Sequence, residues 1–344
     1  MAGDTLLEIR GLKTHFATAE GLVKAVDGVD LTVRRGRTLC VLGESGCGKS
    51  ITARSVLQIV DRPGRIVAGQ ILLHGADGTA VDIAALPPAG REIRAIRGAR
   101  IAMIFQEPMT SLSPVHTIGN QIVETILLHQ PVERAEAEAR AIAMLKRVGI
   151  PNAADRLSAY PFQLSGGMRQ RAMIALALSC EPELLIADEP TTALDVTTQA
   201  TILDLMRDLQ AEFGMAMMFI THDLGVVAEI ADDVAVMYLG EVVEQAPVDA
   251  LFHAPRHPYT RALLGSVPRL GGRRADGLRG RLVSIRGMVP HPFARPDGCP
   301  FNTRCDVVIP GLCRQAHPGL TAVGPEHAAR CHHVAREEGG VHVA

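Results

Sequence analysis

Aromatic side chains are scarce in this sequence of 344 residues. Tryptophan is absent, and Phe and Tyr together make up 3% of the chain. Proteins that bind single-stranded nucleic acid stack bases on aromatic rings, and they attract the phosphates with a positive surface. The formal net charge here is −2. The composition therefore gives no reason to expect a nucleic-acid partner.

Long apolar runs are also missing. No stretch approaches the roughly 18 uninterrupted apolar residues that indicate a transmembrane helix, so we expect none. The segment Met1–Thr5 has no basic region leading into an apolar run, and we expect no signal peptide. Hydrophobic residues make up 47% of the chain and charged residues 21%, as in an ordinary globular protein with a sizeable core.

The hydrophobic pattern predicts an α/β fold. Strand-like segments fill the first ~50 residues, and short apolar strands recur at 184–187 and 217–220. Between them, residues 117–159 have helical periodicity, and within this region the helix predicted at 135–148 ends at Gly149-Ile150-Pro151. Strands that alternate with helices favour a mostly parallel, covered sheet. Residues 271–295 hold six arginines and one acid, which is typical of irregular structure.

A glycine-rich segment follows the predicted strand 38–42 and matches the pattern G-x-x-x-x-G-K-[ST]. Its backbone N–H groups and the following helix N-terminus would cradle phosphates, Lys49 would bridge the β- and γ-phosphates, and Ser50 would bind Mg²⁺. A thiol inside such a loop suggests a site of oxidation or alkylation. The predicted nucleotide-binding residues are Gly43, Glu44, Ser45, Gly46, Cys47, Gly48, Lys49, Ser50 and Ile51.

Two carboxylates end the apolar strand at 184–187. We expect Asp188 to hold Mg²⁺ and Glu189 to polarise the water that attacks the γ-phosphate. Phosphoryl transfer needs positioning and charge stabilisation more than covalent chemistry, so this pair complements the glycine-rich loop.

The segment Leu164–Arg171, with the sequence Leu-Ser-Gly-Gly-Met-Arg-Gln-Arg, narrows the class of nucleotide-binding protein. It resembles the signature motif of ABC ATPases. The resemblance implies that this segment contacts ATP held by an opposite subunit. The residues that carry this role are Ser165, Gly166, Gly167 and Gln170.

Three further loops are similar to loops of that family. Gln106, in Phe105–Pro108, corresponds to the Q-loop residue that touches Mg²⁺ and water. Asp195 ends a Thr-Ala-Leu-Asp segment that resembles the D-loop, and His222 corresponds to the switch histidine at the γ-phosphate. The family also stacks an aromatic ring on adenine, for which Phe16 is our candidate.

The C-terminal part resembles the oligopeptide/dipeptide/nickel importer branch of ABC ATPases, through the segments His257–Pro268, Ile104–Val115 and Gly298–Phe301. The resemblance implies an ATP-binding domain at 1–250 with a helical subdomain near 107–165, an extension at 251–335 and a tail at 336–344. It also implies a dimer with a paralogous subunit or with itself, beneath two transmembrane permeases on the cytoplasmic membrane face. An extracytoplasmic binding protein would deliver the solute. Di- or oligopeptides are expected, with nickel or another small solute as the alternative.

Seven cysteines without an export signal favour a reducing compartment, where a metal site outranks disulfides. Cys299, Cys305, Cys313 and Cys331 lie within 33 residues. Some importer ATPases similar to this chain hold a [4Fe–4S] cluster there, which makes that cluster the leading interpretation. Zinc, helped by nearby histidines, and unligated thiols remain alternatives. The role would be structural or redox-regulatory, because the ATPase motifs are complete without it.

Two other function classes were compared with the importer. A soluble ABC ATPase acting on DNA or the ribosome would carry a second cassette, a long coiled coil or a basic arm, and the sequence has none of these. A regulatory subunit with a dead site is disfavoured by Asp188, Glu189 and His222, which keep the hydrolytic motifs intact.

Overall fold

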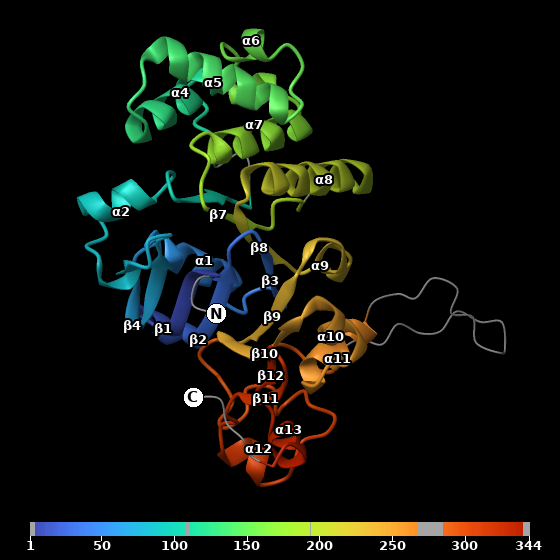
Figure 1. Cartoon of the computed structure of the whole chain (residues 1–344). Coiled ribbons are helices and arrows are strands. Elements are labelled where there is room, and N and C mark those ends of the chain that lie inside the picture. Colours follow the sequence, from blue (N-terminus) through green and yellow to red (C-terminus); the bar gives the residue numbers. More distant parts are fainter. Residues whose placement is uncertain (1–3, 107–110, 193, 267–284, 340–344) are drawn as a thin grey trace, which may run out of the picture.

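The computed structural model describes residues 4–106, 111–192, 194–266 and 285–339. Within these residues the strands form two sheets, which Figure 1 shows side by side. One sheet is antiparallel, with the strand order β2-β1-β4-β5, and the other has the order β11-β12-β10-β9-β3-β8-β7-β6. The strands are β1 (Thr5–Thr18), β2 (Gly21–Arg34), β3 (Thr38–Leu42), β4 (Gly64–His74), β5 (Ala80–Asp82), β6 (Ile101–Ile104), β7 (Leu184–Asp188), β8 (Ala216–Thr221), β9 (Asp233–Tyr238), β10 (Glu241–Pro247), β11 (Thr321–Gly324) and β12 (His327–Ala329).

The helices cover the larger sheet and build a separate layer above it (Figure 1). They are α1 (Lys49–Val56), α2 (Arg91–Ile96), α4 (Ile118–His129), α5 (Arg134–Arg147), α6 (Ala153–Arg156), α7 (Gly166–Leu178), α8 (Val196–Phe213), α9 (Leu224–Ile230), α10 (Val248–His253), α11 (Pro258–Gly265), α12 (Leu312–Gln315) and α13 (His332–Glu337). Short 3₁₀ turns occupy Ile83–Ala85 and Pro161–Gln163.

The centre of the larger sheet is parallel, as the sequence predicts. β9, β3, β8, β7 and β6 all pair in the same direction, and β3, β7 and β8 are buried throughout. Alternate residues of β3 serve two cores. Cys40 and Leu42 pack toward the helices, whereas Leu39 and Val41 pack toward the antiparallel sheet. Two-sided burial explains why this strand is apolar at every position after Thr38.

The carboxyl ends of these strands meet at one edge. Leu42 pairs with Thr221, and Asp188 pairs with Ile220, so the loops that follow β3, β7 and β8 start side by side. In open α/β sheets this edge is where ligands bind.

The predicted helical insertion is confirmed as the upper layer in Figure 1, where α4, α5 and α7 pack together. Thr117 caps α4, because its hydroxyl accepts a hydrogen bond from the Asn120 N–H at 3.2 Å. The layer includes α7, which lies beyond the expected limit at residue 165. The expected start, residues 107–110, lies outside the described residues.

The C-terminal extension adds strands to the larger sheet. β12 pairs with β10, with Glu244 opposite Ala329, and β11 pairs with β12. Of the predicted irregular segment 271–295, residues 285–295 are described and contain no regular helix or strand. The rest of that segment, and the tail beyond residue 339, lie outside the described residues.

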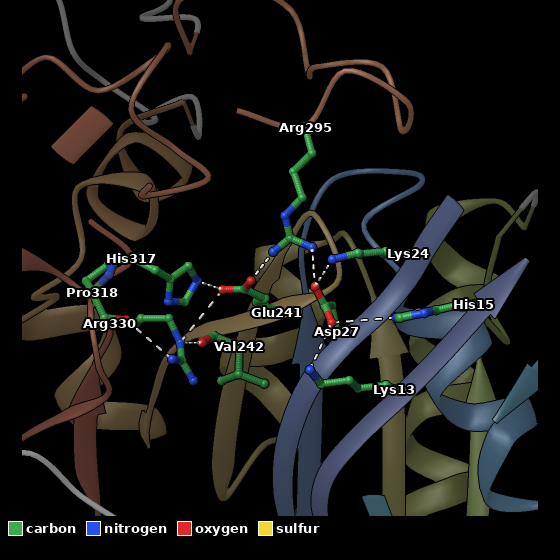
Figure 2. Close-up of polar contacts among 10 residues, drawn as sticks. All are labelled: Lys13, His15, Lys24, Asp27, Glu241, Val242, Arg295, His317, Pro318 and Arg330. Carbon is green, nitrogen blue, oxygen red and sulfur yellow. Dashed lines mark hydrogen bonds and ion pairs between the residues drawn. The ribbon is translucent and has the colours of Figure 1, made fainter. Parts of the chain in front are cut away.

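Figure 2 shows how charges attach the extension to both sheets. Arg295 pairs with Glu241 at the start of β10 and, at 3.1 Å, with Asp27 of β2. His317 contacts the second oxygen of Glu241 at 2.7 Å. Burial alone would raise the pKa of Asp27. The positive charges of Arg295 and the nearby Lys24 lower it, and together they outweigh burial, so the pKa lies below the usual value. The network therefore fixes the extension against β2 of the antiparallel sheet and β10 of the larger sheet.

No helix in the described ranges is long and apolar enough to cross a membrane.

Candidate nucleotide-binding site

A cavity of about 620 Å³ opens where β3, β7 and β8 end. It brings together most residues of the predicted glycine-rich loop with residues from three other predicted loops. Its described lining residues are Ala25, Glu44, Ser45, Gly46, Gly48, Lys49, Ser50, Ile51, Gln106, Glu189, Thr192 and His222.

The loop wraps the lysine side chain. Lys49 is 5% exposed, and its Nζ donates to the carbonyl oxygens of Gly43 at 2.8 Å and Glu44 at 3.1 Å. The loop leads into α1 through Gly48, whose φ of +100° only glycine adopts easily. The N–H groups at the start of α1 remain directed toward the same end of the sheet, which suits an anion.

The oxygen ligands expected for a metal lie together. The Ser50 hydroxyl donates to Asp188 Oδ1 at 2.8 Å, and Asp188 is 2% exposed. Burial raises the pKa of Asp188, the Ser50 hydrogen bond opposes this rise, and the neighbouring Glu189 charge adds to it. A buried carboxylate beside a second negative charge is stabilised by a cation. A hydroxyl and a carboxylate are also the hard oxygen donors that Mg²⁺ prefers, so these residues fit the ion.

Three further polar side chains that line the cavity contact Glu189. Its carboxylate receives hydrogen bonds from Gln106 Nε2 at 3.0 Å and from the Thr192 hydroxyl at 3.0 Å, and His222 Nδ1 lies 3.2 Å away. Its backbone has φ +46°, an uncommon conformation for a residue with a side chain. Strained backbone of this kind concentrates at functional sites.

The structure keeps the signature segment away from the cavity: no described lining residue comes from it. Ser165 caps α7 by accepting from the Met168 N–H at 3.3 Å, and a Cβ on Gly166 would meet nothing within 4 Å. This glycine-rich helix N-terminus is open to a ligand from outside the chain. Gln170 is buried and donates to the carbonyl of Pro190, which connects the signature helix to the segment after Glu189.

Asp195 lies at the N-terminus of α8. It accepts from the backbone N–H and the hydroxyl of Thr198, at 3.0 and 2.8 Å, and these hydrogen bonds lower its pKa. The neighbouring residue 193 of the predicted D-loop lies outside the described residues.

Two residues predicted to take part in nucleotide binding, Phe16 and Cys47, have surroundings that differ from the prediction. Phe16 is half-buried on β1, with its ring against Gly64, and is not among the described residues that line the cavity. Its contact with adenine stays a prediction. Cys47 is 1% exposed, and burial raises its pKa, with Lys49 opposing the rise. A buried, protonated thiol is unreactive, so the structure argues against the oxidation or alkylation that the sequence suggested.

The four C-terminal cysteines do not form a metal site in this structure. All seven cysteines are free thiols. In the part of the chain that is described, no three His, Cys, Asp or Glu side chains converge as a metal ion would require. Burial raises the pKa of Cys299 to about 12, and the other three thiols of the segment add to this rise. The thiols share a region, yet their arrangement does not support the predicted iron–sulfur cluster.

Sequence reasoning missed three contacts of the site region. It placed Thr192 in the D-loop segment but not beside Glu189, whose carboxylate accepts a hydrogen bond from the Thr192 hydroxyl. Ala25 reaches the loop from β2 through its backbone, which no side-chain pattern reveals. Arg304 contacts the loop from 260 residues away in sequence, where no local pattern relates the two.

Family models match two parts of this sequence. Residues 26–192 match the model described as ABC transporter. Residues 243–313 match the model of the oligopeptide/dipeptide transporter C-terminal region. A Brucella melitensis ATP-binding protein named for peptide import is 52% identical over 96% of this chain and 98% of its own length.

The chain belongs to the ABC transporter ATP-binding proteins.

Within this family, the Escherichia coli dipeptide transport ATP-binding protein DppD is 44% identical over 95% of this chain and 96% of its own length. The Bacillus subtilis oligopeptide transport ATP-binding protein AppD is 48% identical over the same shares. Among solved structures, cbiO1 of Clostridium perfringens has a TM-score of 0.60 at 27% identity, and covers 73% of this chain and 92% of its own. The dimeric bacterial cassette MJ0796 has a TM-score of 0.61 at 25% identity, and covers 71% and 99%. This chain thus has the ABC ATPase fold with a C-terminal extension beyond it.

Proposed function

We propose that this ABC ATPase drives the import of di- or oligopeptides. The observation that carries the proposal is the C-terminal region, which matches the oligopeptide/dipeptide transporter model and is covered by relatives named for dipeptide and oligopeptide transport. Import of nickel or another small solute is the alternative. The nucleotide cavity lies in the ATPase and not on a solute path, so its residues do not distinguish the two.

In the proposed mechanism the glycine-rich loop and Lys49 bind the phosphates of ATP. Ser50, Asp188 and Gln106 would hold Mg²⁺, which neutralises charge on the phosphate oxygens when bound. Glu189 accepts a hydrogen bond from the attacking water, and His222, beside it, contacts the γ-phosphate. The hydrogen bonds to Glu189 from Gln106 and Thr192 keep its carboxylate oriented toward the cavity.

The complete site takes a second subunit. Ser165, Gly166 and Gly167 would contact ATP held by an opposing ATPase subunit, either a paralogue or a second copy. Asp195 would lie at the interface between them. The N-terminus of α7 supports this arrangement, because Gly166 is unobstructed and no described residue of that helix lines the chain's own cavity. The dimer would bind two permease subunits at the cytoplasmic face of the membrane, with a binding protein outside.

An iron–sulfur cluster is not part of this proposed mechanism. The hypothesis that Cys299, Cys305, Cys313 and Cys331 hold one is tested by anaerobic purification with analysis of iron and acid-labile sulfide. We expect neither to copurify stoichiometrically, given the arrangement of the thiols. Four irons per chain would contradict this expectation.

The proposed function is tested in vesicles that contain this chain, its partner ATPase subunit and its permeases, supplied with the binding protein. We expect ATP-dependent uptake of a labelled dipeptide, and its loss in Lys49→Ala. Uptake of nickel in place of peptides would establish the alternative. ATP hydrolysis that no tested peptide or metal stimulates would contradict an import function.

A further inference from the structure

The C-terminal part of the chain contacts the glycine-rich loop at Glu44. Arg304 donates to both carboxylate oxygens of Glu44, from Nη1 at 2.6 Å and from Nη2 at 3.0 Å. The backbone N–H of the same Glu44 donates to the hydroxyl of Tyr259 at 3.0 Å. Side chain and backbone of one loop residue are therefore both held from outside the ATPase motifs.

Arg304 is fixed in place. Its side chain is 4% exposed, and its Nε donates to the carbonyl oxygen of Arg286 at 2.9 Å. The guanidinium lies 5.7 Å from the ring centre of Tyr238 and 6.0 Å from that of Phe301. The hydrogen bond to Glu44 raises the Arg304 pKa above its ordinary value. A bidentate, mostly buried pair differs from the flexible ion pairs of protein surfaces, which contribute little.

Tyr259 is held equally firmly. It is fully buried near the start of α11, and its ring centre lies 4.7 Å from that of Tyr238 and 5.3 Å from that of Phe301. Burial raises its pKa, so the hydroxyl stays protonated. Three aromatic rings and Arg304 thus form a rigid support beneath one end of the loop.

The position of Glu44 explains why it needs this support. Glu44 lines the cavity, and its carboxylate is the one negative side chain among the described loop residues 43–50. A free carboxylate at that place would repel a triphosphate, and it would also compete for the N–H groups that bind the phosphates. The guanidinium of Arg304 neutralises this charge and fixes it in one orientation.

We propose that Arg304 is a positioning residue for ATP binding, which acts by neutralising and orienting Glu44. The inference rests on the proposed role of the glycine-rich loop. It gives the peptide-transporter extension a direct effect on nucleotide affinity. Because a repulsion of this kind acts on ATP in the ground state and in the transition state alike, Arg304 affects KM for ATP more than kcat.

The test measures equilibrium binding of Mg²⁺-ATP to the purified full chain by titration calorimetry. We expect Arg304→Met to raise Kd by about tenfold, since the methionine keeps the aromatic contacts and removes the charge. Adding Glu44→Gln to this variant should recover most of the affinity, because it removes the charge that Arg304 neutralises. Arg286→Met is the matched control. Its guanidinium pairs with the exposed Asp306, and it should bind ATP like the wild type.

A charge-keeping variant covers the case in which Arg304→Met folds poorly. Arg304→Lys should have an intermediate Kd, since lysine retains the charge without the bidentate geometry. In the assembled transporter, Arg304→Met should raise KM for ATP and change kcat less.

Three results would overturn the inference: wild-type affinity in Arg304→Met, no recovery in the double variant, or an Arg304→Lys affinity no better than that of Arg304→Met. Lys49→Ala separates this inference from the proposed function. If it abolishes ATP binding while Arg304→Met has no effect, only the role of Arg304 fails. If Lys49→Ala binds ATP normally, the loop itself is misassigned.

Discussion

Acidification should destabilise the C-terminal extension through one buried histidine. His257 is 1% exposed and caps α11, with its Nδ1 accepting from the Tyr259 N–H at 3.1 Å. Burial lowers the pKa of His257 to about 4, although the nearby Glu244 opposes this. Protonation would also convert the Nδ1 acceptor into a donor facing another donor. The folded chain therefore contains the neutral imidazole at neutral pH.

The direction in which the free energy of unfolding changes with pH follows from the number of protons that each state binds. An unfolded chain binds the proton near pH 6.5, whereas the folded chain binds it only near pH 4. Below pH 6.5 the unfolded state holds more protons, so the free energy of unfolding falls as the pH falls, until both states are protonated. The full effect is about 3 kcal/mol, and about 2 kcal/mol of it should be lost between pH 7 and pH 5.

Urea unfolding at the two pH values measures this loss. The chain has no Trp and only 3 Tyr, so tyrosine fluorescence reports largely on Tyr259, which contacts His257, and on Tyr238, whose ring packs against Tyr259. His257→Asn keeps a good capping side chain without a titrating group, so it should remove the roughly 2 kcal/mol that His257 contributes to the pH dependence. His253→Asn, at an exposed site four residues earlier, should behave like the wild type. If His257→Asn loses as much stability at pH 5 as the wild type does, the reasoning is wrong.

Three other substitutions test separate parts of the structure. Glu189→Gln should lower ATP hydrolysis by about 10²–10⁴-fold while ATP still binds, since an amide cannot accept the proton of the attacking water; turnover at the wild-type rate in the assembled complex would disprove the assignment. Gly48→Ala should abolish measurable ATP binding, because a Cβ there would lie 2.2 Å from the carbonyl oxygen of Ala25 in a backbone with φ +100°; unchanged affinity would show that the loop can relax. Arg295→Met should reduce the free energy of unfolding by about 2 kcal/mol, because it leaves the buried Glu241 with one strong charge partner fewer; an unchanged urea midpoint would mean that the network in Figure 2 adds no stability.

The sequence was sufficient to predict that the main polar residues of the cavity meet, because they follow strands. Lys49, Glu189 and His222 each come after a short apolar run, and parallel strands place their carboxyl ends at one edge. Local patterns of this kind determine both the strand and the loop that follows it. The same reasoning located the helical layer from the spacing of its apolar residues, for example Ile118, Ile122 and Ile126, all of which are buried.

Contacts between distant segments could not be predicted in this way. No local pattern relates Arg304 to Glu44 or Arg295 to Asp27, because the partners are brought together only by the docking of the extension on both sheets. The cysteines show the same limit. Their number and closeness in sequence suggested a cluster, but a metal requires converging side chains, and sequence distance does not specify direction.

The extension is a structural part of the ATPase and not an appendage to it. Glu244 of β10 is fully buried, and its carboxylate accepts from the backbone N–H groups of Arg256 and His257 and contacts His327 at 2.8 Å. All three partners follow residue 250. A chain cut there would lose these donors and the strand β12 that covers β10, so we expect truncation at residue 250 to lower the free energy of unfolding. Contacts of this kind cross the predicted boundary at residue 250 and join the extension to the sheet that ends at the nucleotide cavity.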